Sequence, residues 1–323
     1  MSKTAFITGI TGQDGSYLAE FLLAKNYQVI GLVSPKNDIG LLNIEAIKGK
    51  LILEEGDLLD EQSLKRIIYR HHPSEIYNLG GITFVPFAWE QPELTFKVNA
   101  LGPLKILTLM NKLCPKARFF QATSAKIFGD SQTAPQNEST PVKPFGPYGV
   151  SKVCAHFLVQ NFRDHFNLFA CSGIMYNHES ERRGLQFVTR KITSTAVKIK
   201  LGKTKELLLG NINTKQDWGY APDYVEAMWL MLQQKKPDDY VIATGKLHSV
   251  KEVCEIAFSY LDLDWKNYVK YQTELLRKEE AEKFYGDAAK ARKVLGWQSK
   301  TSFKQMIVKM VNNDLKLIKG ENL

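Results

Sequence analysis

The stretch Thr4-Ala-Phe-Ile-Thr-Gly-Ile-Thr-Gly-Gln-Asp-Gly15 decides the fold of this chain. It begins as a short apolar run and continues into three glycines with the spacing Gly9-x-x-Gly12-x-x-Gly15. A helix-like pattern follows to residue 24, and residues 27–33 are apolar again. Strand, glycine turn, helix and strand in this order predict a β-α-β unit, because a turn without side chains lets the backbone approach a pyrophosphate at the helix N-terminus.

Strand and helix patterns alternate beyond this unit. We expect strands over residues 50–54, 75–79, 118–122, 169–175 and 240–243, and helices over 61–71, 96–113 and 148–165. Such alternation predicts an α/β fold with a Rossmann-like, doubly wound parallel sheet and a smaller, mostly C-terminal substrate-binding lobe. The dinucleotide-binding domain is expected over residues 1–175 with a later contribution from about 212–245, and the lobe over 176–211 and 246–323.

The composition argues against several classes of protein. The net charge of +9 is spread over the 323 residues without a nucleic-acid-binding motif, which favours a solvated lysine-rich surface. The four cysteines form no CxxC pair and the six histidines show no metal-ligand spacing. No apolar stretch has the length that spans a bilayer. We therefore expect a cytoplasmic protein without a metal, a nucleic-acid partner or a membrane partner.

A second motif, Tyr148-Gly-Val-Ser-Lys152, indicates redox chemistry at carbon. One helical turn places Tyr148 and Lys152 on the same face, where the lysine charge lowers the pKa of the phenol from about 10 toward neutrality. Ser124, at the end of a predicted strand, can donate a hydrogen bond to the same substrate oxygen. A tyrosine and a lysine four residues apart are, by themselves, usually just two exposed side chains on a helix. With the glycine turn upstream, it predicts that Tyr148 takes a hydroxyl proton while hydride leaves the same carbon for a nicotinamide.

The expected cofactor is NADP, with NAD as the alternative. The second strand ends in Val33-Ser-Pro-Lys36 and lacks the acid that binds the ribose hydroxyls of NAD, whereas Lys36 can face a 2′-phosphate. Asp57, with Leu58, is expected at the adenine, although an aspartate after a strand is also an ordinary helix cap. The predicted cofactor-binding residues are Gly9, Thr11, Gly12, Gln13, Asp14, Gly15, Lys36, Asp57, Leu58, Tyr148 and Lys152.

Longer stretches resemble the extended short-chain dehydrogenase/reductase superfamily and, within it, the GDP-mannose 4,6-dehydratases. The similar segments span nearly the whole chain and include residues 7–23, 75–80, 177–180, 182–184, 187–192, 217–219 and 223–232. The resemblance implies a GDP-sugar substrate and a homodimer or homotetramer. Basic and amide donors suit a diphosphate. The positions that match the family's nucleotide-sugar contacts are Asn177, Arg183, Val188, Lys191, Asn213 and Arg277, with Glu280 beside them.

The chain departs from the family at Lys126, where the family has a glutamate that removes the C5 proton and helps expel the C6 hydroxyl. A desolvated Lys126 near Lys152 and an oxidised nicotinamide would have a depressed pKa, so it can act as a neutral base and then as an acid. CDP-glucose 4,6-dehydratases are similar in having lysine at this place.

A GDP-sugar 4,6-dehydratase, with Ser124, Lys126, Tyr148 and Lys152 as catalytic residues, is therefore the first prediction. A GDP-sugar epimerase that works through a transient 4-keto intermediate is the second. A 4-keto reductase is the third, and a non-enzymatic dinucleotide-binding protein is the last.

Overall fold

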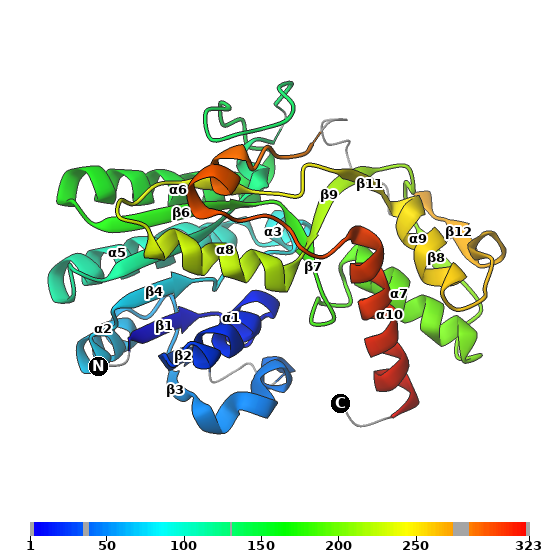
Figure 1. Cartoon of the computed structure of the whole chain (residues 1–323), viewed down its shortest axis with the longest axis horizontal. Coiled ribbons are helices and arrows are strands. Elements are labelled where there is room, and N and C mark those ends of the chain that lie inside the picture. The colour runs from blue at the N-terminus through cyan, green and yellow to red at the C-terminus, as the bar shows by residue number, and fades with distance from the viewer. Residues whose placement is uncertain (1–2, 35–38, 130, 274–283, 321–323) are drawn as a thin grey trace.

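A seven-stranded parallel sheet forms the centre of the molecule (Figure 1). The computed structural model describes residues 3–34, 39–129, 131–273 and 284–320. The strand order is β10-β6-β5-β4-β1-β2-β3, and every neighbouring pair is parallel. The order reverses between β1 and β4, as in other doubly wound sheets. The strands are β1 (Thr4–Thr8), β2 (Gln28–Val33), β3 (Ile52–Glu55), β4 (Glu75–Asn78), β5 (Arg118–Ser124), β6 (Phe169–Met175) and β10 (Tyr240–Ile242).

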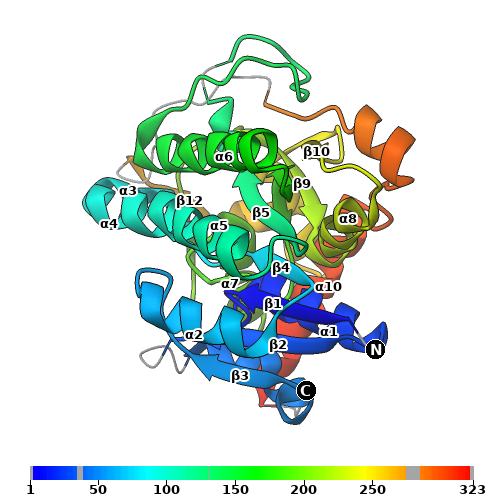
Figure 2. The ribbon, with the colours of Figure 1, turned by 90° about the vertical axis from the view of Figure 1, so that its left-hand side faces the viewer.

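Helices cover both faces of this sheet, as Figure 2 shows. Consecutive strand residues point to opposite faces. Ala5 and Ile7 of β1 therefore pack with α1 (Gln13–Ala24) and α8 (Ala221–Gln233). Phe6 of the same strand packs with α2 (Glu61–His71), α5 (Gly102–Leu113) and α6 (Gly146–Phe166). Burial on both faces explains why these strands are apolar without alternation, and the architecture confirms the predicted Rossmann-like fold.

Short elements connect these layers. Two short helices precede α5, and several tighter or wider helical turns occupy connections. Their bounds are η1 (Ile39–Lys50), α3 (Val85–Glu90), α4 (Pro92–Phe96), η2 (Lys97–Leu101), η3 (Ala125–Ile127), η4 (Trp265–Asn267) and η6 (Ala291–Leu295).

A smaller lobe lies beyond the carboxyl ends of the strands, at the right of Figure 1. Its three-stranded sheet has the order β11-β9-β7, and its two-stranded sheet joins β8 to β12. Apolar side chains of α7, α9 and α10 form a separate core with these strands. The bounds are β7 (Asn177–Glu179), α7 (Val188–Lys200), β8 (Leu207–Leu209), β9 (Lys215–Tyr220), β11 (Leu247–Ser249), α9 (Val250–Ser259), β12 (Val269–Tyr271) and α10 (Phe303–Lys319).

β6 leads directly into β7, so the carboxyl edge of the large sheet faces the lobe. Ligands of open α/β sheets bind at this edge, next to the point where the strand order reverses. In the described part of the chain, we find no helix with the length and apolar character that crossing a bilayer requires.

Candidate active site

The glycine turn between β1 and α1 is shaped for close approach of a ligand. Gly9 has a φ of +69°, and a Cβ there would lie 2.7 Å from the nitrogen of Gly80. A Cβ on Gly15 would lie 2.1 Å from the carbonyl oxygen of Gly9. Gly12 is the N-cap of α1, and no side chain caps this helix start. Its backbone N–H groups and the positive end of the helix dipole therefore suit a pyrophosphate, and the turn fits a dinucleotide.

The other residues that were predicted to bind the cofactor make different contacts in the structure. The carbonyl oxygen of Thr11 accepts a hydrogen bond from Asn43 Nδ2 at 2.9 Å. Asp57 is exposed and its Oδ1 accepts a hydrogen bond from the Leu59 nitrogen at 2.8 Å, whereas the N-cap of the following helix α2 is Asp60. The side chain of Leu58 belongs to the core between the sheet and α2. Lys36 lies outside the described residues.

Gln13 and Asp14 connect the turn to β7 and the residues after it. Gln13 Nε2 donates to the carbonyl oxygen of His178 at 3.1 Å, and Gln13 Oε1 accepts from Ser180 Oγ at 2.8 Å. Asp14 Oδ2 lies 2.8 Å from His178 Nε2. The sequence interpretation assigned these side chains to the cofactor alone and missed their contacts with the lobe. Nothing in the local pattern of residues 13–14 points to a partner some 160 positions later.

Burial and pairing act in opposite directions on the Asp14–His178 pair. Burial raises the pKa of Asp14, but the charge and hydrogen bond of His178 outweigh it and hold the pKa below its ordinary value. Burial likewise lowers the pKa of His178, but Asp14 outweighs it and raises that pKa. The ion pair is therefore the favoured state of these two groups.

Ser124, Tyr148 and Lys152 come together at the carboxyl edge of β5. Tyr148 and Lys152 lie on α6, which starts with a proline in its first turn, and both side chains are buried. Ser124 and Tyr148 share a side-chain hydrogen bond. Lys152 Nζ donates to the carbonyl oxygen of Ala122 at 2.9 Å and lies 5.8 Å from the centre of the Tyr148 ring. The spacing of the sequence motif and the end of β5 together produce this group.

The electrostatics of the group differ from the sequence expectation. Burial raises the pKa of Tyr148, whereas the hydrogen bond from Ser124 and the charge of Arg183 lower it. The cation that acts on the phenol here is thus Arg183 of the lobe, while the Lys152 ammonium is directed at the Ala122 carbonyl. Burial lowers the pKa of Lys152 to about 8, against the opposing charge of Asp14.

Lys126 belongs to the turn η3 that directly follows β5. Its backbone nitrogen donates to Ser124 Oγ at 3.2 Å, so Ser124 caps the turn that carries Lys126. The side chain is half-buried, and its Nζ lies 4.8 Å from the centre of the Phe284 ring. An ammonium over an aromatic face is a favourable arrangement. Lys126 is therefore fixed to the same strand end as Ser124.

Arg183 is the best-defined of the predicted substrate residues. Its guanidinium lies 3.6 Å from the centre of the Phe187 ring. Its Nε is 3.1 Å from Glu179 Oε2, but the N–H direction leaves this buried nitrogen without a hydrogen-bond partner among the described residues. Phe187 also contacts Phe84 edge to face, with ring centres 5.8 Å apart. This bridge from the lobe to the segment before α3 was not predicted, and no sequence signal marks it.

The remaining predicted substrate residues are distributed around the lobe. Asn177 Nδ2 donates to Gln216 Oε1 at 2.9 Å. Val188 is the first residue of α7, and Lys191 lies one turn later, where burial lowers its pKa. Asn213 is exposed in the loop before β9. Arg277 and Glu280 lie outside the described residues.

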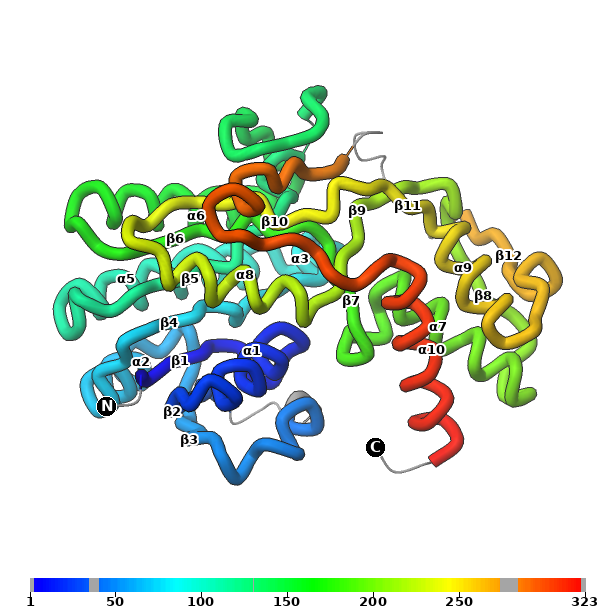
Figure 3. The backbone as a smooth tube through the Cα atoms, viewed as in Figure 1, coloured from blue at the N-terminus to red at the C-terminus, as the bar shows by residue number. Residues whose placement is uncertain are grey.

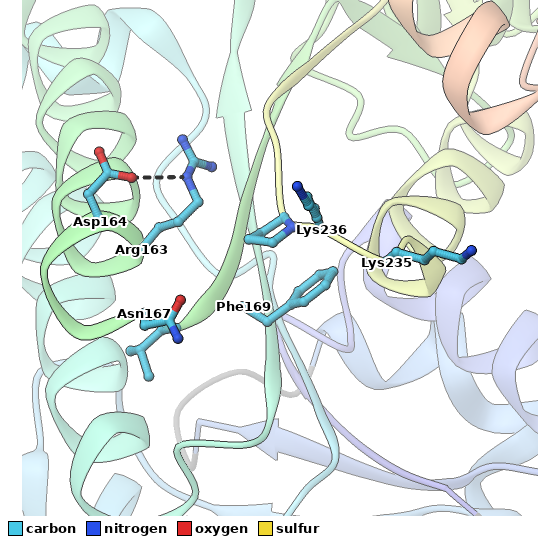
Figure 4. Close-up of a pocket in the computed structure, with 8 residues that line it drawn as sticks. Arg163, Asp164, Asn167, Phe169, Lys235 and Lys236 are labelled. Carbon is cyan, nitrogen blue, oxygen red and sulfur yellow. Dashed lines mark ion pairs between the residues drawn. The ribbon is translucent and has the colours of Figure 1, made fainter.

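A cavity of about 590 Å³ lies elsewhere, between the end of α6 and the segment after α8 (Figure 4). Its lining includes Phe169, which begins β6, whereas the catalytic group stands at the opposite end of the neighbouring strand. Arg163, which also lines it, is 3.8 Å from Asp164 and bonds to Asp239. None of the predicted site residues lines this cavity.

Comparison with known proteins identifies relatives along the whole chain. The GDP-mannose 4,6 dehydratase family model matches residues 6–310. GDP-mannose 4,6 dehydratase 2 of Arabidopsis thaliana is 45% identical over 99% of this chain and 89% of its own length. GDP-mannose 4,6 dehydratase of Homo sapiens is 41% identical over 98% of this chain and 92% of its own length.

Two solved structures illustrate the shared fold. UDP-glucose 4-epimerase of Thermotoga maritima, determined with UDP-glucose, superposes with a TM-score of 0.87 at 22% identity, covering 98% of this chain and 99% of that one. RMD from Pseudomonas aeruginosa, determined with NADPH, gives a TM-score of 0.84 at 21% identity, covering 98% and 100%. At such identities the likeness describes architecture alone.

Proposed function

The chain belongs to the GDP-mannose 4,6-dehydratase family, and from this premise we propose how its residues convert a GDP-sugar to the 4-keto-6-deoxy product. The proposed substrate is GDP-mannose or a related GDP-hexose or GDP-heptose. The observation that carries the proposal is the group formed by Ser124 and the buried Tyr148 and Lys152, beside the glycine turn. That group supplies the proton chemistry of alcohol oxidation, and the turn supplies the place for the dinucleotide.

The residues of the turn support a bound nicotinamide dinucleotide. Gly9, Gly12 and Gly15 would hold the pyrophosphate at the start of α1, and Tyr148 and Lys152 would contact the nicotinamide ribose. Bound there, the nicotinamide supplies a hydride acceptor for C4 and later a hydride donor for C6. We propose NADP as the form used, with Lys36 at its 2′-phosphate.

Tyr148 removes the proton of the C4 hydroxyl, and Ser124 donates a hydrogen bond to the same oxygen. Burial raises the pKa of Tyr148 above its ordinary value, and the hydrogen bond from Ser124 and the charge of Arg183 reduce this rise without reversing it. Lys152, whose pKa is lowered to about 8, is protonated near neutrality, and its ammonium, 5.8 Å from the centre of the Tyr148 ring, donates to the Ala122 carbonyl.

Lys126 carries the second proton. As a neutral amine it takes the C5 proton from the 4-keto sugar, and as the resulting ammonium it gives that proton to the C6 hydroxyl, which leaves as water. When hydride adds to C6, C5 takes a proton that comes from solvent. Its place on the turn capped by Ser124 supports this role, since both side chains then approach the sugar from the end of β5. The family's glutamate does the same with a carboxylate.

Arg183 is proposed to bind the diphosphate. Its guanidinium is held against Phe187 and is ion-paired with Glu179, so its position is set before a ligand binds, and a forked guanidinium suits a diphosphate. Asn177, Val188, Lys191, Asn213, Arg277 and Glu280 are proposed as further nucleotide-sugar contacts from their matching positions.

A second candidate function, epimerisation through a transient 4-keto sugar, is favoured by one observation. Ala125 and Lys126 follow Ser124, so the turn carries no acid. A site that removes a proton but does not expel the C6 hydroxyl would invert the neighbouring centre.

Incubation with GDP-mannose and related GDP-sugars in deuterated water separates these functions. Loss of water with deuterium at C5 supports the dehydratase. A configurational change without loss of water supports the epimerase. Product that forms only when NADPH is added identifies a reductase, and cofactor binding without product from any GDP-sugar identifies a non-enzymatic dinucleotide-binding protein. NMR of the products distinguishes the first three outcomes.

We also propose that two copies of the chain pair through α6. Val150 and Phe157, seven residues apart, lie on the face of α6 opposite its buried residues and are 46% and 45% exposed. Phe96 and Leu101, on helices that pack against α6, are also exposed. Exposed apolar side chains on helices that pack together are typical of a protein–protein interface.

A further inference from the structure

Arg190 joins the helix α7 to the C-terminal helix α10 through a buried ion pair. Arg190 Nε lies 2.9 and 3.2 Å from the two carboxylate oxygens of Asp314, and its Nη2 lies 2.5 Å from Oδ1. Both side chains are buried. Thr193, one turn along α7, donates to Asp314 Oδ2 at 2.7 Å. Figure 3 shows the two helices side by side, and their residues are in contact.

The same guanidinium also holds the backbone of the segment after β7. Arg190 Nη1 donates to the carbonyl oxygen of Glu181 at 2.7 Å and to that of Arg183 at 3.0 Å. Two carbonyl groups that are two residues apart thus converge on one nitrogen. These two hydrogen bonds fix the backbone conformation of residues 181–183, and therefore the backbone position from which the Arg183 side chain extends.

The position of Arg183 matters for the site. Its guanidinium is stacked on Phe187, and its charge acts on both Tyr148 and Asp14. A shift of the backbone at residue 183 would move this charge relative to the catalytic group. A flat, forked guanidinium is needed at Arg190, because an ammonium cannot bind a carboxylate in two places and two carbonyls together.

We propose that Arg190 is a positioning residue for substrate binding, which, held by Asp314, presents Arg183 to the diphosphate of the GDP-sugar. This inference rests on the proposed function, in which Arg183 binds the diphosphate. A buried ion pair adds little stability over well-packed apolar residues. The two further hydrogen bonds from Arg190 to the carbonyl oxygens of residues 181 and 183 give this pair a role in positioning the backbone instead. The C-terminal helix therefore sets the affinity for a ligand that α10 need not touch.

The test measures the affinity of the full chain for GDP, guanosine and NADPH in Arg190→Lys and Asp314→Asn variants. We expect the dissociation constant for GDP to rise about 10- to 100-fold, the loss that follows when a charge-assisted hydrogen bond is misplaced. Guanosine carries no phosphate, so its affinity and that of NADPH should not change. General damage to the lobe would instead weaken guanosine as much as GDP, and that result would overturn the inference. Thr193→Val, which removes only one bond to Asp314, provides a milder variant with an expected change in the same direction.

Asp239→Asn is the matched control. Asp239 forms a similarly buried two-point pair with Arg163, at 2.9 and 3.0 Å, on the far side of the sheet from the lobe. This variant should lose stability but keep the GDP affinity of the parent chain. Equal weakening of GDP binding in Asp239→Asn would contradict a role specific to Arg190.

A double-mutant cycle with Arg183→Ala separates the inference from the proposed function. If Arg190 acts through Arg183, then Arg190→Lys changes GDP affinity little in the Arg183→Ala background. Unchanged GDP affinity in Arg183→Ala alone would refute the diphosphate role of Arg183. A loss in Arg183→Ala with no loss in Arg190→Lys or Asp314→Asn, or strictly additive losses, would refute the positioning role of Arg190.

Discussion

Lys126 is the residue at which the proposed mechanism differs from one that uses a glutamate. It occupies the turn capped by Ser124, and in that mechanism it is the second proton-transfer group. A lysine base and a carboxylate base respond oppositely to burial, since burial favours the neutral form of each.

The Lys126→Ala variant should lose dehydration by about 10²- to 10⁴-fold, the usual contribution of a positioned acid or base. Oxidation at C4 should persist, because Tyr148 and Ser124 remain. Product NMR and single-turnover reduction of the bound nicotinamide check the two steps separately. Lys126→Glu, which restores the family's residue, should retain dehydration with its optimum moved to lower pH. Undiminished loss of water in Lys126→Ala would exclude a role for Lys126.

Lys152 illustrates the stability cost of a catalytic residue. Burial lowers its pKa from 10.5 to about 8, so holding the charge in the folded state at pH 7 costs about 3 kcal/mol. The bond to the Ala122 carbonyl offsets about 1 kcal/mol. Lys152→Met should therefore raise the unfolding free energy of the cofactor-free protein by about 1–2 kcal/mol while abolishing turnover. Chemical denaturation measures the first effect.

The pH dependence of the unfolding free energy tests whether the buried charge of Lys152 causes this effect. Between pH 8 and 10.5 the folded state releases the Lys152 proton while the unfolded chain keeps it, so the parent protein gains stability as pH rises through this range. The advantage of Lys152→Met should shrink accordingly. If the difference in unfolding free energy between Lys152→Met and the parent chain stayed constant from pH 7 to 10.5, side-chain packing and not the charge of Lys152 would account for it.

Among the elements, α1 and the segment after β7 form the clearest functional contact. Gln13, Asp14 and Ser16 of α1 bond to residues 178–182, so the turn that would hold the cofactor is linked to the segment that carries Arg183. Tyr17 adds a bond to Glu181 Oε2 at 3.0 Å. These side-chain contacts hold α1 against the segment after β7.

Asp14→Asn should weaken this contact by about 2 kcal/mol in the pH range where the ion pair is formed. His178 has a raised pKa, so its contribution is full below 6.5 and is lost as pH rises through its folded-state pKa. Asp14 has a lowered pKa, so its contribution is full above 3.8 and is lost as pH falls through its folded-state pKa. The stability difference should thus be greatest between pH 3.8 and 6.5, as measured by urea denaturation across pH.

Glu54→Gln provides the comparison for this element. Glu54 pairs with His71 Nε2 at 2.7 Å, with both side chains largely buried, but no catalytic group is involved. Glu54→Gln should lower the stability without a change in kcat/KM, whereas Asp14→Asn should lower both the stability and kcat/KM. Equal activity in the two variants would show that the α1 contact is structural only.

At the scale of the whole molecule, the same fold is compatible with several different reactions. The similar solved structures include epimerases and dehydratases, so the architecture does not distinguish these reactions. What distinguishes them is carried by a few side chains at the carboxyl edge of the sheet, facing the lobe. The packing of the lobe against this edge places Arg183 where its charge acts on Tyr148.

The exposed face of α6 leads to a prediction about assembly. Phe157→Glu should convert a dimer to monomers, because a charge replaces apolar area at the centre of the proposed interface. Light scattering after size-exclusion chromatography measures the mass. Tyr69→Glu, at a 65% exposed aromatic on α2, should leave the mass unchanged. A parent chain that is monomeric at micromolar concentration would refute the proposed pairing.

The sequence by itself determined the large sheet and the oxidation group. Runs such as 169–175 and 61–71 coincide with β6 and α2, because apolar continuity and helical periodicity are local properties of a chain. The motif from Tyr148 to Lys152 places two side chains on one helix face, again through local geometry. Family resemblance then supplied the substrate class, which no periodicity contains.

Only the tertiary structure decided how the lobe serves the site. The three-residue strands β7 and β11 and the six-residue strand β9 were not predicted, since these elements carry too little pattern of their own and exist through pairing with distant partners. Likewise, the contact of Asp14 with His178 and the bonds of Arg190 to residues 181 and 183 join groups that the chain connects only through folding. Charge and hydrogen bonding act through space, so the pKa of Tyr148 depends on Arg183, a residue 35 positions away in a different lobe.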